Sequence, residues 1–540
     1  MADTKRDADR KPGTGTRTKR EIERKYDAAA DSALPDLTGV GGIADVVGQG
    51  VTDLDAVYYD TPDERLAAAS ITLRRRTGGS DAGWHLKLPV AHGTRDEVHA
   101  PLTDDPSDDV PDALRDLVRA HVRGADLAPV VRLRSARDLH HLLGGDGAVL
   151  AEISVDGVLA ERLGSGTGTV AWTEIEVELA DGGDPALLDK VDKKLRKAGV
   201  RPSAASSKLA RALAETADGG PGPASGDTAR DKPGRPGRPG TLQSADASAG
   251  GHVLAYCRKQ RDALLEWDVA VRQDVPDSVH KMRVATRRLR SAFKSYRKVL
   301  DRTVTDPLGD ELKWLAAELG VDRDREVLLD RLTAAVDDVP RTLLLGPARA
   351  RLQVWGVAGR ADARQLTLTV LDSERYLLLV DRLDTLLADP PLRKAAAAPA
   401  TDVLPKVLLK DYGRLAARVG DALALAPGEE RDLALHEARK AAKRARYAGE
   451  AAKPALGKAA ARFAKRMKAV QTVLGEHQDS VVARETLRDL AVQAHAAGES
   501  AFVWGLLYGR EEAAAAAGER ELPEVWGRAA RPKVRSALGG

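Results

Sequence analysis

The sequence of 540 residues predicts two folded domains of different class: an α+β domain rich in antiparallel strands, then an all-α domain. Three observations support this division. Before about residue 215, apolar and polar side chains alternate with a period of two, as in strands with one buried face. After about residue 250, the chain is rich in Ala and Leu with helical periodicity. A stretch rich in Gly, Pro, Ser and Asp lies between these parts.

The composition places the boundaries. Residues 1–18 are expected to be a disordered tail, 19–215 the β-rich domain, 216–249 a flexible linker and 250–540 the helical domain. The linker contains too few apolar residues to form a core. Turn signals such as TGGSDAG, GGDGA and GSGTGT separate the predicted strands. Two helices are expected within the β-rich domain, in PDALRDLVRAHV and PALLDKVDKKLRKAG.

Charged residues recur on one face of the predicted strands. EIERK places Glu21, Glu23 and Lys25 opposite Ile22, and TEIEVEL places three glutamates opposite three aliphatic residues. A charged strand face is often simply solvated. Because acids and bases alternate along the whole domain, we favour a closed sheet with a charged interior, which is a tunnel. The further members of this set are Arg74, Arg76, His85, Lys87, Arg95, Glu97, His99, Glu152, Ser154 and Asp156.

Such a tunnel suits metal-assisted phosphoryl chemistry. Neighbouring carboxylates repel one another unless a cation lies between them, and carboxylate oxygens are preferred ligands of Mg²⁺ and Mn²⁺. Arg and Lys would neutralise the phosphates and position them for attack by an oriented water. The pattern GxxxxGK[ST] is absent, so an ordinary P-loop NTPase site is not indicated. The sequence also lacks a Ser nucleophile elbow.

The ordered set of E-x-E-x-K, Arg-x-Arg, a strand Lys and a late E-x-E resembles the CYTH, or triphosphate tunnel metalloenzyme, family. The resemblance covers residues 19–215 and implies an eight-stranded antiparallel β tunnel. Adenylyl cyclases, thiamine-triphosphatases and inorganic triphosphatases belong to this family. The resemblance implies catalytic roles for Glu21, Glu23, Lys25, Glu174 and Glu176. It implies metal binding by Glu21, Glu23, Glu97, Asp156, Glu174 and Glu176, and phosphate binding by Lys25, Arg74, Arg76, Lys87, Arg134, Arg137 and Lys208.

Two assignments in this set have alternatives. In VVRLRSARDLHH, Arg132 and Arg134 share a face, and Arg137 lies on the other unless a bulge intervenes. The family requires a base here, and we take Arg134 and Arg137. Glu152 and Glu178 are either additional ligands or charges at the rim.

The helical domain contains an internal duplication. HKMRVATRRLR at residue 280 matches HEARKAAKRAR at residue 436, and LKWLAAELGVDRD matches MKAVQTVLGEHQD at an offset one residue smaller. Two blocks at nearly one offset indicate a repeat. We therefore expect two pseudosymmetric helical bundles, at about residues 250–400 and 401–525.

Each copy carries a stripe of basic residues. On the first helix, His280, Arg283, Arg287, Arg290 and Lys294 fall within an arc of about 80°. Their repulsion costs about 1 kcal/mol of helix stability. A solvated face is the ordinary reading of such a stripe. Its recurrence and its shortage of acids favour a binding surface for a linear polyanion. Aromatic residues make up only 4% of the chain and no nucleic-acid-binding motif is present, so nucleic acid is not the expected partner.

The repeated block and the downstream LG…D elements resemble a CHAD domain, a helical family linked to polyphosphate binding. The resemblance implies polyphosphate contacts from His280, Arg283, Arg287, Arg290, Lys294, His436, Arg439, Lys443 and Arg446. We expect the combined substitution of Arg283, Arg287, Arg439 and Lys443 by Ala to abolish this binding without destabilising the fold.

The expected protein is a cytoplasmic hydrolase that uses Mg²⁺ or Mn²⁺ on inorganic triphosphate or phosphate chain ends, and that binds polyphosphate through its helical domain. The alternatives are a non-catalytic polyphosphate-binding protein and an adenylyl cyclase. The single Cys257 excludes a disulfide framework and a multi-cysteine metal site. No signal peptide and no apolar run of 18 residues is present, so no membrane association is expected. The helical domain would also target the enzyme to polyphosphate granules.

Overall fold

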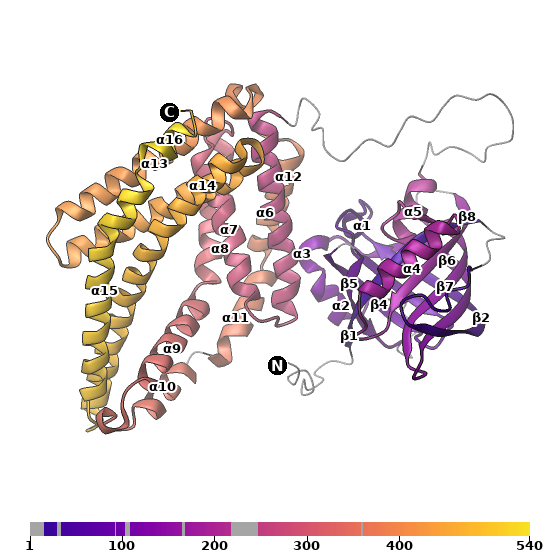
Figure 1. Ribbon diagram of the computed structural model, residues 1–540, viewed down its shortest axis with the longest axis horizontal. Coiled ribbons are helices and arrows are strands. Elements are labelled where there is room, and N and C mark those ends of the chain that lie inside the picture. Colours follow the sequence, from indigo (N-terminus) through magenta and orange to yellow (C-terminus); the bar gives the residue numbers. More distant parts are fainter. Residues whose placement is uncertain are drawn as a thin grey trace. The chain divides into compact units, whose positions relative to one another are not determined.

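The computed structural model divides into two compact units, Met1–Pro233 and Gly234–Gly540 (Figure 1). It describes residues 16–29, 34–91, 93–102, 109–164, 168–217, 247–357 and 360–539. Most of the predicted tail and linker lies outside the described residues. The first strand begins at Arg17, two residues inside the predicted tail.

The first unit is built on a closed antiparallel barrel of eight strands. β1 closes it, because its residues 17–22 pair with β5 and its residues 23–28 pair with β8. A two-residue strand, β9 (Arg201–Pro202), adds to β1 outside the ring. The predicted eight-stranded tunnel is thereby confirmed. The eight barrel strands are β1 (Arg17–Ala28), β2 (Ile43–Asp60), β3 (Thr72–Thr77), β4 (Gly83–Ala91), β5 (Thr94–Ala100), β6 (Ala128–Gly144), β7 (Val149–Arg162) and β8 (Thr169–Leu179).

Helix α4 (Ala186–Lys197) determines which strand faces look inward. Its Leu188, Val191 and Leu195 are fully or almost fully buried, and they belong to one apolar cluster with Ile175 and Val177 of β8. Since side chains alternate along a strand, burial of these two residues beneath α4 turns the glutamates of β8 to the barrel interior. The same logic applies to Ile153 and Asp156 on β7, whose apolar and acidic residues lie on opposite faces.

Helix α5 (Lys208–Glu215) packs against β6 and β7. It begins where the hydroxyl of Ser207 accepts a hydrogen bond from the backbone N–H of Ala210, which caps the helix. Leu209 and Leu213 pack with Leu133 and Trp172 of the barrel. This packing carries Lys208, at the first turn of α5, into the charged interior. The remaining helices of this unit are α1 (Arg65–Ala68), α2 (Asp112–Leu117) and α3 (Arg119–Val122).

The described part of the second unit is helical throughout, apart from isolated bridges and connecting loops. Its longest element, α14, contains Gly457 at φ 54° and ψ −127°, which divides it into two helices at a kink. The helices are α6 (Ala249–Arg272), α7 (Ser278–Ser295), α8 (Arg302–Glu318), α9 (Val321–Asp337), α10 (Ala348–Val357), α11 (Arg360–Asp372), α12 (Glu374–Ala388), α13 (Ala400–Ala424), α14 (Glu429–Ala496), α15 (Phe502–Ala529) and α16 (Pro532–Ser536), with 3₁₀ turns at Arg341–Leu343 and Lys394–Ala397.

The two predicted repeats meet in a reciprocal contact. Arg288 of α7 donates to Glu450 of α14 at 3.0 Å. Its equivalent in the second repeat, Arg444, donates to the carbonyl of Lys294 and to the hydroxyl of Ser295. Because Lys294 and Glu450 are equivalent positions, each repeat contacts the other through the same pair of sites. Such reciprocity is the signature of approximate two-fold symmetry.

Among the described helices, none combines the length and the apolar character needed to cross a lipid bilayer.

Candidate active site and anion-binding site

Three carboxylates of the barrel interior form what we call the acidic cluster. They belong to Asp156 of β7 and to Glu174 and Glu176 of β8, and each offers an oxygen within 4.8 Å of the other two. Asp156 and Glu174 are directly paired across the two strands. Both side chains are buried, so their charges need partners inside the barrel.

The ammonium group of Lys208 lies among these carboxylates. Its Nζ is 2.9 Å from Asp156, 2.6 Å from Glu174 and 2.7 Å from Glu176. Burial alone would lower the pKa of Lys208, but the surrounding carboxylates raise it well above its usual value, so the side chain is charged. The ammonium therefore occupies the position that a cation would take. Three hard oxygen ligands fit Mg²⁺ or Mn²⁺, provided that Lys208 is displaced.

Further bases complete this end of the barrel. Arg137 of β6 donates two hydrogen bonds to Asp156, at 2.8 and 2.6 Å, and one to Glu176 at 2.9 Å. Lys25 of β1 pairs with Glu23 at 2.9 Å and also with Glu176. Burial opposes the charge of Lys25, but these two carboxylates raise its pKa overall. One network thus joins these predicted residues: Glu23, Lys25, Arg137, Asp156, Glu174, Glu176 and Lys208.

A second group, from β1, β3, β4 and β5, carries the other predicted residues. Lys87 lies 2.6 Å from Glu21 and 3.8 Å from Glu97, and Arg74 lies 4.0 Å from Glu97. Burial raises the pKa of Glu21 to about 7; Lys87 opposes this shift and the neighbouring Glu97 adds to it. Because its pKa lies near neutral pH, an additional cation nearby would favour the ionised form of Glu21.

The arginines of β3 add positive charge to this second group, where Arg76 pairs with the exposed Asp81. Arg76 is buried, and burial together with Arg74 and Arg137 lowers its pKa to about 9. Repulsion among buried cations is relieved by an anion, so this part of the tunnel is suited to hold phosphate. Arg74 also donates to the hydroxyl of Tyr58 at 3.3 Å.

The structure corrects one predicted tunnel residue. The side chain of Arg134 is 53% exposed, and it lies on the outer face near Asp55, with which Arg132 also pairs. The pairing of β6 with β7 is continuous from Val131 to Leu142, so no bulge turns Arg134 inward. Arg137 is the base that this segment contributes to the interior.

The rim and two overlooked residues complete the tunnel. Glu178 pairs with Lys19 at 2.7 Å and Glu152 lies 3.4 Å from His141, so both carboxylates are paired outside the acidic cluster.

Sequence reasoning missed Tyr58 and Trp172. The indole N–H of Trp172 donates to Glu174 at 2.6 Å. Its position two residues before Glu174, on the same strand face, was the available signal.

In the helical unit, the two basic stripes converge on what we call the shared basic cluster: Arg283 and Arg287 of α7 with Arg439 and Lys443 of α14. Burial lowers the pKa of Lys443 to about 8, and Arg439 and Arg287 add to this shift. Burial likewise lowers the pKa of Arg287, with contributions from Arg283 and Arg439. The bases of both repeats therefore act on one another across the α7–α14 contact.

The LG…D elements hold one arginine of each repeat. Arg283 donates to Asp324 at 2.9 and 3.2 Å, and Arg439 donates to Asp479 at 3.4 Å. A Cβ on Gly320 would lie 2.8 Å from an Nη atom of Arg283, so the glycine leaves room for the guanidinium. Sequence reasoning aligned Asp324 with Asp479 but assigned them no role. Arg283 is only 8% exposed, so we expect its replacement to destabilise the fold, in contrast to the expectation from the sequence.

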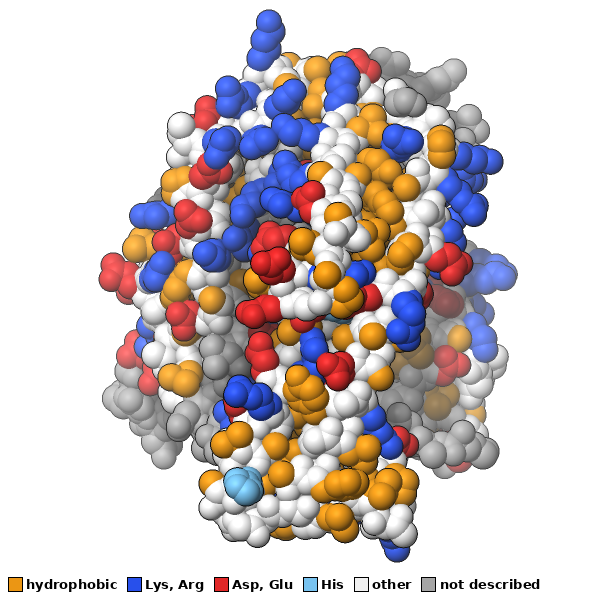
Figure 2. Space-filling view, turned by 90° about the vertical axis from the view of Figure 1, so that its left-hand side faces the viewer, with side chains coloured by type: hydrophobic (Ala, Val, Ile, Leu, Met, Phe, Trp, Pro, Cys, Tyr) orange, Lys and Arg blue, Asp and Glu red, His pale blue; other side chains and the backbone are white. Residues whose placement is uncertain are grey.

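The other members of the stripes differ in exposure. Lys294 is exposed, whereas His280, Arg287, Arg290 and His436 are partly buried. His436 contacts the amide oxygen of Gln478 at 2.6 Å. Arg446 turns to Glu450 at 2.7 Å and Gln471 at 3.1 Å, inside its own repeat. Lys and Arg side chains gather in the upper half of the face drawn in Figure 2, whereas Asp and Glu gather nearer its middle.

Comparison with known proteins identifies both units. The CYTH domain model matches residues 19–213 and the CHAD domain model matches residues 255–488. The chain is 37% identical over 506 residues to uncharacterized protein Rv2226 of Mycobacterium tuberculosis, a match that covers 91% of this chain and 92% of that protein.

Solved structures are more distant. PptA from Streptomyces chartreusis is 22% identical, with a TM-score of 0.45, over 52% of this chain and 99% of its own. The CHAD domain from the plant Ricinus communis is 26% identical, with a TM-score of 0.37, over 57% of this chain and 97% of its own. On the strength of its two matched domains and its mycobacterial relative, the chain belongs to the family of proteins in which a CYTH domain is followed by a CHAD domain.

Proposed function

We propose that the CYTH domain hydrolyses inorganic triphosphate, or phosphate at the end of a longer chain, with Mg²⁺ or Mn²⁺, and that the CHAD domain binds polyphosphate. One observation carries the catalytic part: a closed barrel holds three clustered carboxylates and also arginines of β3 that have other cations as neighbours. A metal ion and a polyanion can therefore be bound next to each other in a single interior.

In this proposal, the acidic residues bind the metal ion and the basic residues bind the phosphates. Asp156, Glu174 and Glu176 would hold the cation, which when bound would polarise phosphoryl oxygens and acidify its water. Arg74, Arg76 and Lys87 would hold the phosphates, since guanidinium groups match phosphate oxygens in pairs. Lys25 and Arg137 contact the acidic cluster and belong to the same network, so they would fix its carboxylates beside the substrate.

The shared basic cluster supports polyphosphate binding by the CHAD domain. Burial and neighbouring arginines lower the pKa values of Lys443 and Arg287, and phosphate groups arriving from solvent would relieve that repulsion. A linear chain could contact both repeats at once because the cluster draws on α7 and α14. The domain would then raise the local concentration of substrate or direct the enzyme to polyphosphate deposits.

A protein that only gripped chain ends would need the bases of the tunnel but not its carboxylates. The acidic cluster therefore favours hydrolysis over simple binding. Adenylyl cyclase activity remains compatible with a metal-binding tunnel, and product analysis distinguishes it from hydrolysis.

The test is phosphate release from inorganic triphosphate by the purified full chain with Mg²⁺, Mn²⁺ or EDTA. We expect metal-dependent release that Glu21→Gln/Glu23→Gln lowers by about 100-fold or more, as removal of groups supporting a metal site does. The rim variant Glu152→Gln is the matched control and should retain activity. Absence of release from triphosphate and from longer chains would refute the catalytic proposal. Cyclic AMP formed from ATP would assign the tunnel to the cyclase class instead.

Polyphosphate binding is measured separately on the same preparation. Arg287→Ala/Lys443→Ala should weaken binding and leave triphosphate turnover unchanged. Unchanged binding in this variant would refute the role of the shared basic cluster without affecting the catalytic proposal.

A further inference from the structure

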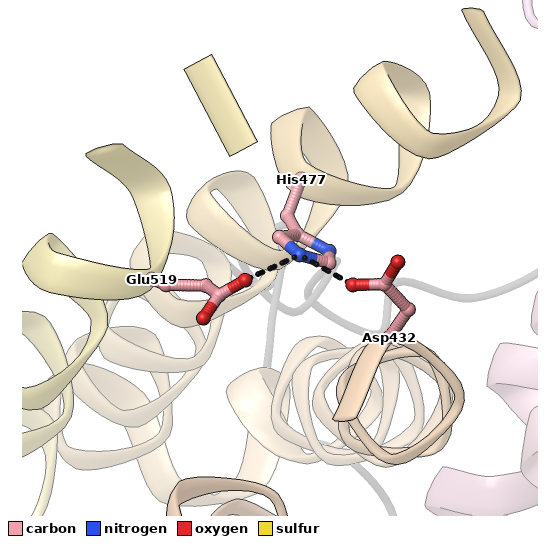
Figure 3. Close-up of side chains that lie close together, drawn as sticks. All are labelled: Asp432, His477 and Glu519. Atoms are coloured by element: carbon pink, nitrogen blue, oxygen red, sulfur yellow. Dashed lines mark hydrogen bonds and ion pairs between the residues drawn. The ribbon is translucent and has the colours of Figure 1, made fainter. Parts of the chain in front are cut away.

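A second group of potential metal ligands lies in the CHAD domain, away from the basic stripes. Asp432 comes from the first part of α14, His477 from its second part, beyond the kink at Gly457, and Glu519 from α15. Figure 3 shows both carboxylates directed at one nitrogen of the imidazole. The three ligand atoms lie within 4.8 Å of one another.

One ring nitrogen of His477 faces two carboxylate oxygens; its contact with Glu519 is a hydrogen bond, and both separations are longer than a charge-assisted hydrogen bond. Nε2 of His477 is 3.2 Å from Asp432 and 3.3 Å from Glu519. A nitrogen carries at most one hydrogen, so it cannot donate well to both oxygens, and a charge-assisted bond would be about 2.7–2.9 Å long. Two ligands of a tetrahedral metal at usual Zn–N and Zn–O lengths lie about 3.3–3.5 Å apart. The observed separations are close to that spacing.

An arginine contacts the oxygen of each carboxylate that does not face His477. The second oxygen of Asp432 accepts a hydrogen bond from Arg484 at 3.0 Å, and the second oxygen of Glu519 pairs with Arg431 at 3.0 Å. This leaves one oxygen of each group facing His477. Outer partners of this kind orient the ligands in metal sites. His477 is 3% exposed, whereas Asp432 and Glu519 are partly exposed, so an ion and a water ligand can reach the group from solvent.

We propose that Asp432, His477 and Glu519 form a binding site for a divalent transition metal of the Zn²⁺ class. An imidazole with two carboxylates selects such an ion over Mg²⁺, which prefers an all-oxygen shell. The ion would tie the two parts of α14 to α15. The two residues that follow His477 contact the second basic stripe: Gln478 contacts His436, and Asp479 pairs with Arg439. A metal at His477 would thereby fix two residues that position the second basic stripe.

The test uses Co²⁺, whose visible absorption reports tetrahedral coordination, titrated into the full chain in excess Mg²⁺. The excess Mg²⁺ is intended to fill the all-oxygen acidic cluster, so that any Co²⁺ signal comes from a nitrogen-containing site. We expect one tetrahedral Co²⁺ per chain. The affinity should fall by at least about 10- to 100-fold in His477→Gln. Two controls should bind as the unmodified chain does: Glu176→Gln in the tunnel, and His495→Gln, an exposed histidine on the same helix.

Two results would overturn the proposal: no tetrahedral Co²⁺ signal in the unmodified chain, or the same signal in His477→Gln. The group would then be a network of hydrogen bonds and ion pairs that binds no metal. If His477→Gln does not fold, Glu519→Gln serves in its place, because it keeps the size of the side chain and removes its charge. Zn²⁺ should also raise the Tm of the unmodified chain and not that of either variant. The site does not depend on the proposed hydrolysis, so phosphate release is a separate measurement and can fail independently.

Discussion

Lysines of the two domains have pKa values shifted in opposite directions. In the tunnel, carboxylates within 3 Å overcome the effect of burial and raise the pKa of Lys208. In the CHAD domain, burial and neighbouring cations act together and lower the pKa of Lys443 to about 8. The pKa of Lys294 is also lowered, by desolvation and by its cationic neighbours Arg290 and Arg444.

The opposite pKa shifts indicate how each site would accommodate a ligand from solvent. The acidic cluster is already neutralised by Lys208, Arg137 and Lys25, so a metal ion must compete with the protein's own cations. The shared basic cluster has Asp324 and Asp479 as acid partners for two of its bases, and these partners do not suppress the mutual repulsion. An incoming anion would stabilise this cluster without displacing a group of the protein. Four predictions test this contrast, beginning with the largest effect.

Removing the internal cation of the tunnel should have the greatest consequence. Lys208→Met leaves buried carboxylates with fewer partners, and breaking a buried ion pair from one side costs about 3–5 kcal/mol of unfolding free energy. Mg²⁺ should restore part of this loss, because the variant has no ammonium in the cation position. Thermal unfolding of the full chain, with and without Mg²⁺, measures both effects.

The control for this variant is Lys19→Met, which removes an exposed pair with Glu178 and should change stability by less than about 1 kcal/mol. Equal stabilisation of Lys208→Met and the unmodified chain by Mg²⁺ would show that the ion does not take the place of Lys208.

Two arginines of the same stripe should differ in their effect on stability. Arg283→Ala removes charged hydrogen bonds to Asp324 from a buried position and should cost about 1–3 kcal/mol. Arg287→Ala relieves repulsion within the shared basic cluster and should leave the stability unchanged or higher. Denaturant unfolding followed by a polyphosphate titration of each variant gives both quantities. A loss of stability in Arg287→Ala as large as that in Arg283→Ala would contradict the assignment.

The smallest effect is a pH dependence from Lys443. Since its pKa is about 8, it loses its proton between pH 7 and 9, and polyphosphate affinity should fall over that range. The fall is about tenfold for each unit by which bound phosphate raises the pKa. Lys443→Arg keeps its charge and should remove this step. Isothermal titration at several pH values provides the comparison, and a step that persists in Lys443→Arg would assign it to another group.

The free energy of unfolding should rise with pH, whereas the polyphosphate affinity should fall. The unfolded chain, with an ordinary lysine, binds more protons than the folded chain between pH 8 and about 10.5. The contribution of Lys443 to the unfolding free energy therefore rises with pH across this interval. In Lys443→Met that rise should be absent.

Much of the fold could be read from local patterns. The period-two alternation of TEIEVEL predicted which face of β8 carries the glutamates, because a strand offers only two faces. The same rule placed Arg132 and Arg134 together and Arg137 opposite. The prediction that both Arg134 and Arg137 face the tunnel followed the family resemblance, and it was wrong for Arg134 because no bulge separates the two residues. The duplicated blocks predicted the two repeats, whose reciprocal contact the structure contains.

The contacts that depend on tertiary packing could not be predicted. The contacts of Lys208 with three carboxylates follow from the docking of α5 on Leu133 and Trp172, far away in the sequence. The helical arc of the first stripe also gave no indication that Arg283 is buried while Lys294 is exposed. That difference arises from α8 and α9, which bring Gly320 and Asp324 against the guanidinium.

The reciprocal contact between the repeats amounts to a homodimer interface fused into one polypeptide. In a true homodimer every substitution appears twice, whereas here each half can diverge alone. The position occupied by Lys294 in one half is Glu450 in the other, and Glu450 is already engaged by Arg288 and Arg446. A phosphate chain bound across the axis, as proposed above, would therefore meet a cation at one end and an anion at the other. Divergence of the two repeats would then give this surface a direction along which a uniform polymer is held.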